Sequence, residues 1–508
     1  MADGSDVTVP TRSSSWHVLA AGRPSRFGAL LLFGSAVVGV IALHLATNGT
    51  LGFHTDELYY LDCGRHPAFG YVDFPPIVPL LAHLETSLLG ISPWRLRVLP
   101  TLLGGFMVAL SGLYVRRLGG TLRLQCLALL IAVAAPYFLG ANWVYQTVTF
   151  DEVTWMVALY WFVCLVTDRR PRYWVHLGIT VGIGLEVKYT IVGLVGGIGV
   201  AIVLTPSLRL ALRTRYPWIA AATVLLVWAP NLVWQVAEGF PSLAYITNHQ
   251  GAGGGPATYL AELFGYLFFL VPVWLAGMIS LFRKPLLRPV GIACAVPLLL
   301  FLFVGKSYYA VGTVPLTMAE GLMVIARLER SRLRAGSQIA VAVACVLEFA
   351  VFARLTLPVT PASQLHAAGL DAQNELFADS VGWDDIARQV QTIYSNLPAA
   401  ERSHTVVISA YYGVPGALWL FGDPSRRPEA VSPQLSDWYW LPKHLTATFA
   451  LMVDYQPAAV AWMCTSSRRI DQLTVPYAVT GLEQGAPVTL CHLKAPVAAL
   501  WPRLRDFS

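Results

Sequence analysis

Charged side chains are scarce in this chain. Only 13% of its 508 residues are Asp, Glu, Lys or Arg, whereas 56% are hydrophobic, and the mean hydropathy is +0.57. A composition so poor in charge excludes an ordinary soluble protein, and a formal net charge of only +6 gives no reason to expect a nucleic-acid partner. The chain is therefore predicted to be a polytopic α-helical membrane protein.

Two signatures of other protein classes are also missing. No Walker-type Gly-Lys-Ser/Thr loop stands between a strand and a helix, which argues against nucleotide-driven transport. No small-residue cleavage site follows the first apolar run, which is longer than the core of a secretory signal, so we interpret it as a retained helix. Residues 1–22, which are rich in Ser and Thr, are expected to form a disordered cytoplasmic tail.

Long apolar segments dominate residues 23–356, which we interpret as a transmembrane domain. The segments predict about eleven helices, and several are shorter than the roughly 20 residues of a straight span. The glycine-rich segment 251–256 is expected to be irregular, either a plain connector or a mobile gate. The expected helical segments are 27–47, 98–115, 123–140, 153–167, 173–187, 190–204, 217–236, 259–281, 290–304, 313–326 and 336–355.

Basic residues lie mostly on alternate connections between these segments. Because Lys and Arg are retained on the cytoplasmic side, the amino terminus is expected inside the cell. An odd number of spans then places residues 357–508 outside, in a multi-pass protein of the cell membrane. The outer connections carry few basic residues, namely Arg65, Arg95, Arg97, Lys188 and Lys306.

Acidic residues gather on the outer side instead. Asp56 and Glu57 open the long first outer loop, residues 48–97, and Asp151 stands at the head of the fourth helix. A carboxylate beside lipid is costly, so we interpret Asp56 and Asp151 as functional, although solvated loops also carry acids. The loop is too long for a connector, and its apolar stretches predict short helices lying in the membrane interface.

Several motifs follow one another in a fixed order along this outer side. They are Thr55-Asp56-Glu57-Leu58-Tyr59-Tyr60, Gly70-Tyr71-Val72-Asp73-Phe74-Pro75-Pro76 and Trp94-Arg95-Leu96-Arg97-Val98-Leu99-Pro100, followed by Asp151 and by Gly305-Lys306-Ser307-Tyr308-Tyr309. The set resembles the signature of the protein O-mannosyltransferase and aminoarabinose-transferase group, membrane glycosyltransferases of the GT-C class (family 39 type). The resemblance implies the GT-C fold and a sugar donor on a polyprenyl monophosphate, used on the outer face.

The chemistry of such a transfer suggests roles for these residues. A general base must take the acceptor proton as the hydroxyl attacks the anomeric carbon, and Asp56 is the candidate, with Glu57 and Asp151 orienting acceptor or sugar. The lipid phosphate leaves as an anion and needs only positive charge beside it. Direct attack predicts an inverting transfer, with mannose as the expected sugar. The remaining candidates for substrate binding are Tyr59, Tyr60, Asp73, Arg97, Lys188, Lys306, Tyr308 and Tyr309.

One departure from the family pattern bears on metal binding. Members that resemble aminoarabinose transferases carry an acid-Lys-Pro-Pro sequence, whereas this chain has Asp73-Phe74-Pro75-Pro76 and lacks that lysine. In that subgroup the acid and a histidine from a later outer loop help bind a divalent metal, and Asp73 with His249 would match them. Two ligands are too few to define a metal site, so reactions with and without a metal both stay open.

The composition changes near residue 357 to a soluble pattern, which predicts an extracytoplasmic α/β domain over 357–508. Helices are expected at 383–396 and 413–421, and strands at 405–410 and 488–493. Cys464 and Cys491 are the only cysteines of this domain, and a disulfide between them and unpaired burial are both open.

A second class of function also fits intramembrane acids and lysines. A secondary transporter or lipid flippase would place such residues along its pathway, but it would show related repeats in the two halves, and none is convincing. The acceptor of a transferase stays open among protein, lipid, glycan and secreted natural products.

Overall fold

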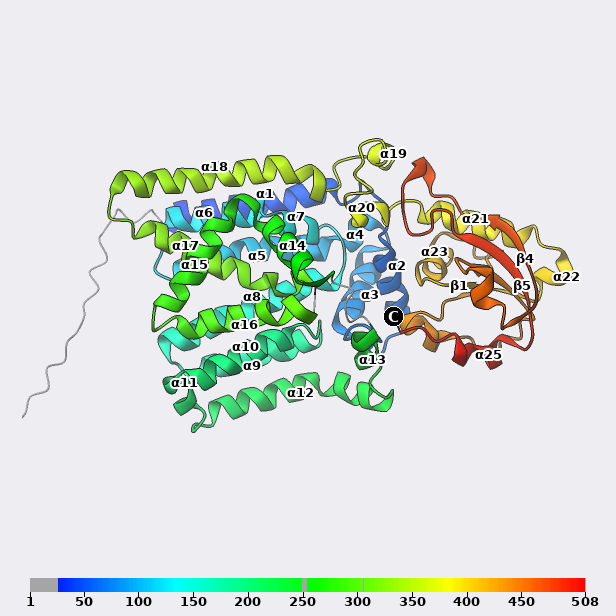
Figure 1. Ribbon diagram of the computed structural model, residues 1–508, viewed down its shortest axis with the longest axis horizontal. Coiled ribbons are helices and arrows are strands. Elements are labelled where there is room, and N and C mark those ends of the chain that lie inside the picture. The colour runs from blue at the N-terminus through cyan, green and yellow to red at the C-terminus, as the bar shows by residue number, and fades with distance from the viewer. Residues whose placement is uncertain (1–25, 249–253, 305, 508) are drawn as a thin grey trace, which may run out of the picture.

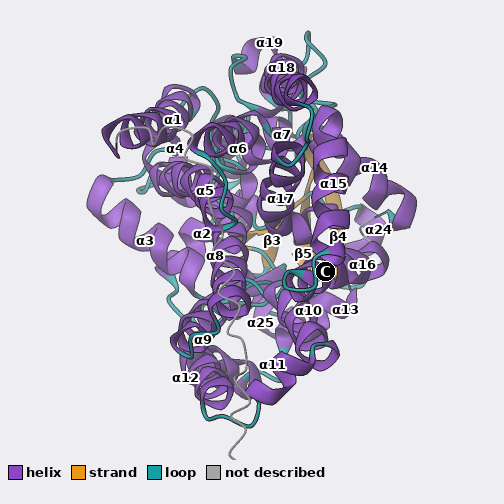
Figure 2. Ribbon diagram, turned by 90° about the vertical axis from the view of Figure 1, so that its left-hand side faces the viewer, coloured by secondary structure: helices purple, strands orange, loops and turns teal. Residues whose placement is uncertain are grey.

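The structure, a computed structural model, describes residues 26–248, 254–304 and 306–507. A bundle of long helices forms one part, and a smaller part built around a β-sheet stands at one end of it (Figure 1). Viewed along the bundle, the strands lie behind the helices (Figure 2). The expected tail, residues 1–22, lies outside the described residues.

The apolar segments expected from the sequence are mainly helical, which confirms a polytopic helical fold. Six helical stretches of the described chain are long and apolar enough to cross a membrane. The bundle helices are α1 (Arg26–Thr47), α5 (Val98–Arg117), α6 (Leu122–Ala134), α7 (Pro136–Ala141), α8 (Thr147–Asp168), α9 (Arg172–Leu185), α10 (Ile191–Leu204), α11 (Pro206–Ala211), α12 (Tyr216–Ala237), α13 (Pro241–Asn248), α14 (Gly255–Leu267), α15 (Val271–Arg283), α16 (Arg288–Val304), α17 (Val314–Ala326) and α18 (Ser331–Thr356). Two of the expected segments are not single helices: 123–140 is divided into α6 and α7 at the extended residue Ala135, and 259–281 is divided into α14 and α15 by a 3-10 turn at Phe268–Leu270.

The start of α14 corrects one expectation. The segment 251–256 is not irregular throughout, because α14 begins at Gly255. Gly254 precedes the helix in a left-handed conformation, with φ of 71°, which glycine adopts without a Cβ clash. Pro256 lies in the first turn, where a missing N–H leaves no hydrogen bond unmade. Residues 249–253 are outside the described part of the chain.

The short helices α9 and α10 pack deeply against their neighbours through glycine. A Cβ on Gly178 of α9 would lie 2.7 Å from the carbonyl oxygen of Ala220 in α12. A Cβ on Gly197 of α10 would lie 2.6 Å from the carbonyl oxygen of Ala293 in α16. Both pairs of helices therefore approach more closely than larger residues allow, which fixes the turn 186–190 that joins α9 to α10.

The first outer loop folds into helices between the bundle and the sheet. They are α2 (Thr55–Arg65), α3 (Ile77–Leu89) and α4 (Pro93–Leu96). A single hydrophobic core includes Tyr59 of α2, Trp143 of the bundle, and Phe377 and Leu418 of the sheet-containing part. Because one core spans all three regions, removing any of them would expose apolar surface on the others.

The sheet-containing part has five strands in the order β2-β1-β3-β5-β4. The pairs β1–β2 and β1–β3 are parallel, whereas β3–β5 and β4–β5 are antiparallel. The expected helices and strands are confirmed within one residue, and β2, β3 and β4 are additions that the sequence did not predict. The main elements are α21 (Trp383–Ser395), β1 (Thr405–Ser409), α23 (Gly413–Phe421), β2 (Ala430–Val431), the 3-10 helix η3 (Leu435–Trp440), β3 (Phe449–Val453), β4 (Cys464–Gln472) and β5 (Pro487–Leu493). Short helices complete it: α19 (Ala362–Leu365), α20 (Glu375–Ala378), α22 (Ala399–Arg402), α24 (Pro457–Val460) and α25 (Val497–Leu500).

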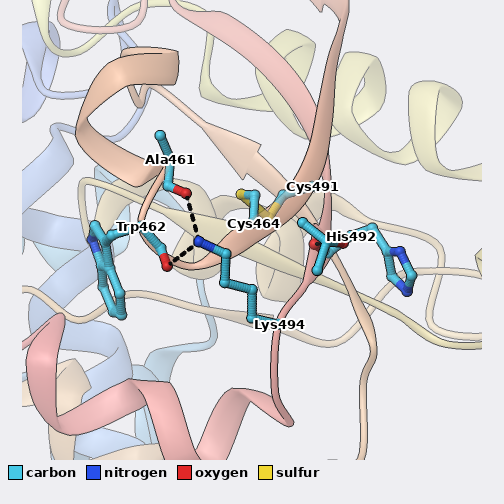
Figure 3. The surroundings of a disulfide bond; sticks show 7 residues. Ala461, Trp462, Cys464, Cys491, His492 and Lys494 are labelled. Carbon is cyan, nitrogen blue, oxygen red and sulfur yellow. Dashed lines mark hydrogen bonds between the residues drawn. A yellow bond between two sulfur atoms is a disulfide. The ribbon is translucent and has the colours of Figure 1, made fainter.

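A disulfide joins the start of β4 to β5. The sequence left open whether Cys464 and Cys491 form a disulfide or are buried unpaired, and in the structure they form the disulfide (Figure 3). Beside the bond, the Lys494 ammonium donates to the carbonyl oxygens of Ala461 and Trp462, over 3.3 and 2.9 Å (Figure 3). The bond ties the edge strand β4 to β5, and the Lys494 contacts tie the end of β5 to the turn before β4.

Candidate active site

The site is built around the start of α2, where a capping arrangement fixes two consecutive acids. The His54 imidazole accepts from the backbone N–H of Asp56 at 3.1 Å, and the His54 N–H donates to Oε2 of Glu57 at 2.9 Å. This reciprocal pairing satisfies backbone donors that a helix start leaves free. It also directs the Glu57 side chain back into the protein, while Asp56 stays partly exposed.

Glu57 forms a fully buried ion pair with Arg97. Nε of Arg97 donates to Oε1 of Glu57 at 2.8 Å, and Nη2 donates to Oε2 at 2.7 Å. Both side chains have no exposed surface. The Tyr145 N–H adds a further hydrogen bond to Oε1, at 2.9 Å. Such a bidentate pair is rigid and determines where the helix start lies relative to the bundle.

The remaining donors of Arg97 point at backbone carbonyls. Nη1 contacts the oxygens of Asn48 and Leu51, at 2.6 and 3.4 Å, and Nη2 contacts the oxygen of Gly52 at 2.6 Å. A guanidinium has five N–H groups, and all five therefore have an acceptor. The geometry favours a positioning role for Arg97 and Glu57, in place of the direct substrate contact that the sequence suggested.

Asp56 instead faces the sheet-containing part. Its Oδ1 accepts from the hydroxyl of Tyr412, which precedes α23, at 2.6 Å. No described residue hydrogen-bonds its Oδ2. The partly exposed carboxylate thus has one oxygen held and one oxygen free, a suitable state for accepting a proton from a substrate.

Asp73 lies close to Asp56 on the other side of Tyr59. The Tyr59 hydroxyl donates to Oδ1 of Asp73 at 3.0 Å. The pKa of Asp73 is raised to about 7, chiefly by burial and to a smaller extent by the charge of Asp56, while the hydrogen bond from Tyr59 and the charge of Lys188 oppose the rise. Tyr60, the other expected tyrosine, is buried and accepts from the Thr147 N–H at 3.4 Å.

Asp151 lies in the second turn of α8 and is buried. Its Oδ2 accepts from the Thr190 hydroxyl at 2.5 Å, while its Oδ1 has no hydrogen-bond partner among the described residues. Both carboxylate oxygens of the adjacent Glu152 are also without one. Buried acceptors left without a donor are costly, so this end of α8 is suited to meet donor groups of a ligand.

Lys188 and Lys306 gather around an aromatic pair. Nζ of Lys188, in the turn between α9 and α10, lies 5.2 and 5.3 Å from the ring centroids of Tyr308 and Tyr309. Nζ of the exposed Lys306 lies 6.0 Å from the Tyr308 ring. Lys188 also interacts electrostatically with Asp151 and Asp56. No carboxylate of a described residue comes within 4 Å of either ammonium.

The structure thus brings together most of the residues selected from the sequence. Lys188 interacts electrostatically with Asp56, Asp73 and Asp151, and Asp73 interacts with Asp56, so the four side chains meet where the first loop, α8 and the turn 186–190 come together. The described residues add no ligand to the predicted metal site at Asp73, because they contain no group of three or more His, Cys, Asp or Glu side chains placed to hold a metal ion. His249 lies outside the described residues, so its pairing with Asp73 stays a prediction.

Two contributors were not found from the sequence. Tyr412 and Ser436 belong to the sheet-containing part and reach back to the first loop. Tyr412 lies 356 residues from Asp56 along the chain. No local motif marks either residue, and only the tertiary fold brings them to the site.

Comparisons with known proteins bear on the fold and the family of the chain. The sequence model of the family described as Dolichyl-phosphate-mannose-protein mannosyltransferase matches residues 73–234. The structure of ArnT from Cupriavidus metallidurans bound to undecaprenyl phosphate is similar, with a TM-score of 0.57, 16% identity, and coverage of 92% of this chain and 99% of that chain. Its apo state gives a TM-score of 0.56 at the same identity and coverage. Arabinofuranosyltransferase AftD from Mycobacteria gives 0.49 at 12% identity, over 93% of this chain and 40% of that one. No curated protein sequence matches the chain.

The likeness to ArnT confirms the GT-C fold that the motifs predicted. The family match covers the stretch that carries Asp73, Asp151 and Lys188. Together these findings support a membrane glycosyltransferase of the GT-C class.

Proposed function

We propose that the protein transfers a sugar from a polyprenyl-phosphate donor to an acceptor hydroxyl at the outer face of the cell membrane. The observation that carries the proposal is the placement of Asp56. Its carboxylate is partly exposed and lies within electrostatic reach of Lys188, which interacts in turn with Lys306. A base and an anion-binding group in one place are what transfer from a phospho-sugar requires.

The lysines and the aromatic pair form the donor side of the proposed site. A lipid phosphate carries negative charge that Lys188 and Lys306 would meet, and neither ammonium has a carboxylate within 4 Å among the described residues. The Tyr308 ring lies beneath both ammonium groups, and the Tyr309 ring lies beneath that of Lys188. The family description names dolichyl-phosphate-mannose and the ArnT structure contains undecaprenyl phosphate, which supports a polyprenyl-phosphate donor with mannose as the first sugar to test.

The proposed step is a direct displacement. The acceptor oxygen attacks the anomeric carbon while the bond from that carbon to the phosphate oxygen breaks, and the lipid phosphate leaves with the bonding electrons. Oδ2 of Asp56 takes the acceptor proton. Asp151 accepts hydrogen bonds from the sugar or the acceptor through its unpartnered Oδ1. One displacement without an enzyme nucleophile inverts the anomeric configuration.

The test compares purified wild type with Asp56→Asn, using labelled polyprenyl-phosphate mannose and a panel of acceptors. Removing a general base is expected to lower transfer by roughly a thousandfold. Asp62→Asn is the matched control on the same helix, because Asp62 is paired with Arg65 at 2.7 Å. Equal transfer by wild type and Asp56→Asn would contradict the proposed role.

Further outcomes of the same experiment test the identity of the sugar, the inversion of the anomeric carbon and the alternative of a transporter. Transfer from another polyprenyl-phosphate sugar, but not from the mannose donor, would keep the reaction and change the sugar. The anomeric configuration of the product, measured by NMR, tests inversion. No transfer from any donor, together with solute or lipid transport, would favour a transporter instead.

A further inference from the structure

Two stacked tyrosines link the acidic side chains of the site. Tyr412 packs on Tyr59 with ring centroids 4.4 Å apart and an interplanar angle of 24°. The hydroxyl of Tyr412 donates to Oδ1 of Asp56 at 2.6 Å, and that of Tyr59 donates to Oδ1 of Asp73 at 3.0 Å. Each ring therefore holds one carboxyl group, and the stacking holds the two rings together.

The stacked pair is anchored from both sides. The Ser436 N–H donates to the Tyr59 hydroxyl oxygen at 3.0 Å, and the Ser436 hydroxyl oxygen accepts from the Val72 N–H at 2.9 Å. Gly413, next to Tyr412, packs so closely that a Cβ there would lie 2.8 Å from Oγ1 of Thr55. These contacts leave Tyr412 little freedom to move, so its hydroxyl has a defined position.

We infer that Tyr412 is a positioning residue for Asp56, an inference that rests on the proposed function. By holding Oδ1, the phenol fixes the rotation of the Asp56 carboxylate and leaves Oδ2 for the acceptor proton. Tyr412 belongs to the sheet-containing part and Asp56 to the first loop. The sheet-containing part therefore supplies the hydroxyl that orients Asp56, the proposed base on the first loop.

The experiment uses purified full-length Tyr412→Phe, which keeps the ring and its stacking and removes only the hydroxyl. We expect kcat to fall at least tenfold, because a misplacement of about 1 Å costs on the order of 100-fold in rate. The KM for the donor and the melting temperature should match those of wild type. Tyr411→Phe is the matched control, since the Tyr411 side chain makes no hydrogen bond to a described residue.

A second measurement does not depend on transfer. Carbodiimide labelling of Asp56, mapped by mass spectrometry, should rise in Tyr412→Phe and stay at the wild-type level in Tyr411→Phe. If wild type transferred no sugar, the proposed function would fail, and the labelling would still decide whether Tyr412 holds Asp56. Wild-type kcat in Tyr412→Phe would overturn the inference. So would unchanged labelling, or a loss of activity matched by an equal loss of folded protein.

Discussion

Successive side chains on a helix point about 100° apart, and the start of α2 uses this to separate two acids. Glu57 points into the protein and binds Arg97, while Asp56 points toward Tyr412. Burying the Glu57–Arg97 pair carries a desolvation penalty that its hydrogen bonds must offset, so the pair adds little net stability. Its main effect is to fix the position of the adjacent residue, Asp56. One acid of the pair is thus structural and the other is available for chemistry.

The Glu57–Arg97 pair leads to a prediction at the residue scale. Arg97→Ala leaves a buried carboxylate without its partner, which costs about 3–5 kcal/mol, so the purified variant should melt at a clearly lower temperature. Arg95→Ala is the control, because Arg95 is exposed two residues away. If Arg97 bound phosphate instead, the variant would melt like wild type and show only a raised KM for the donor.

Residue types on the outer side predicted much of the site. Asp56, Asp151 and Lys188 stand out because charges at membrane level are rare, and the structure places them close together. The role of Arg97 was not predictable, since its acceptors are the Glu57 carboxylate and three carbonyl oxygens that lie 40 to 49 residues away along the chain. A single sequence records which groups are charged, whereas their partners depend on tertiary contacts.

At the scale of elements, the contact of α2 with α23 depends on a glycine. A Cβ on Gly413 would lie 2.3 Å from the Trp383 ring and 2.8 Å from Oγ1 of Thr55. We expect Gly413→Ala to cost about 1–3 kcal/mol through overpacking and to lower both the melting temperature and transfer. Gly265→Ala in α14 should leave both unchanged, because nothing lies within 4 Å of its Cβ position. Equal melting of the two variants would contradict the close packing.

The turn between β4 and β5 carries a second prediction at this scale. Burial, together with Asp454 and Asp379, raises the pKa of Glu483 to about 8, and neither carboxylate oxygen has a hydrogen-bond partner among the described residues. Between pH 4.5 and 8 the folded protein keeps a proton that the unfolded chain releases, so this group makes stability fall as pH rises. Glu483→Gln should therefore gain stability over wild type between pH 5 and pH 8.5, measured by thermal melting. A difference that does not change with pH would contradict the shifted pKa.

Periodicity and composition predicted most elements because apolar runs and turn residues are local signals. The strand β3 was missed since all of its five residues are apolar or small, without the alternation that marks a strand. The strand β4 was missed for the opposite reason, because it is almost wholly exposed at the sheet edge. Its pairing with β5 becomes visible only in the fold.

At the scale of the whole molecule, one hydrophobic cluster joins the end of the bundle to the sheet-containing part. The distribution of basic residues predicts that the sheet-containing part faces the outside. Ser425→Cys should therefore react with a membrane-impermeant maleimide in intact cells, whereas Ser331→Cys should react only after lysis. Wild type is the blank, because four of its five free cysteines are buried and Cys126 is only partly exposed. The reverse pattern would invert the proposed orientation.

The contact between Tyr412 and Asp56 also has a consequence for biosynthesis. Asp56 is translated early and Tyr412 follows 356 residues later, after every helix of the bundle. A nascent chain that has inserted its helices but not yet folded its last segment lacks the phenol beside its carboxylate. Full activity should thus appear only on completed molecules, whereas unfinished or truncated chains in the membrane would hold the proposed lipid-linked donor without transferring its sugar efficiently.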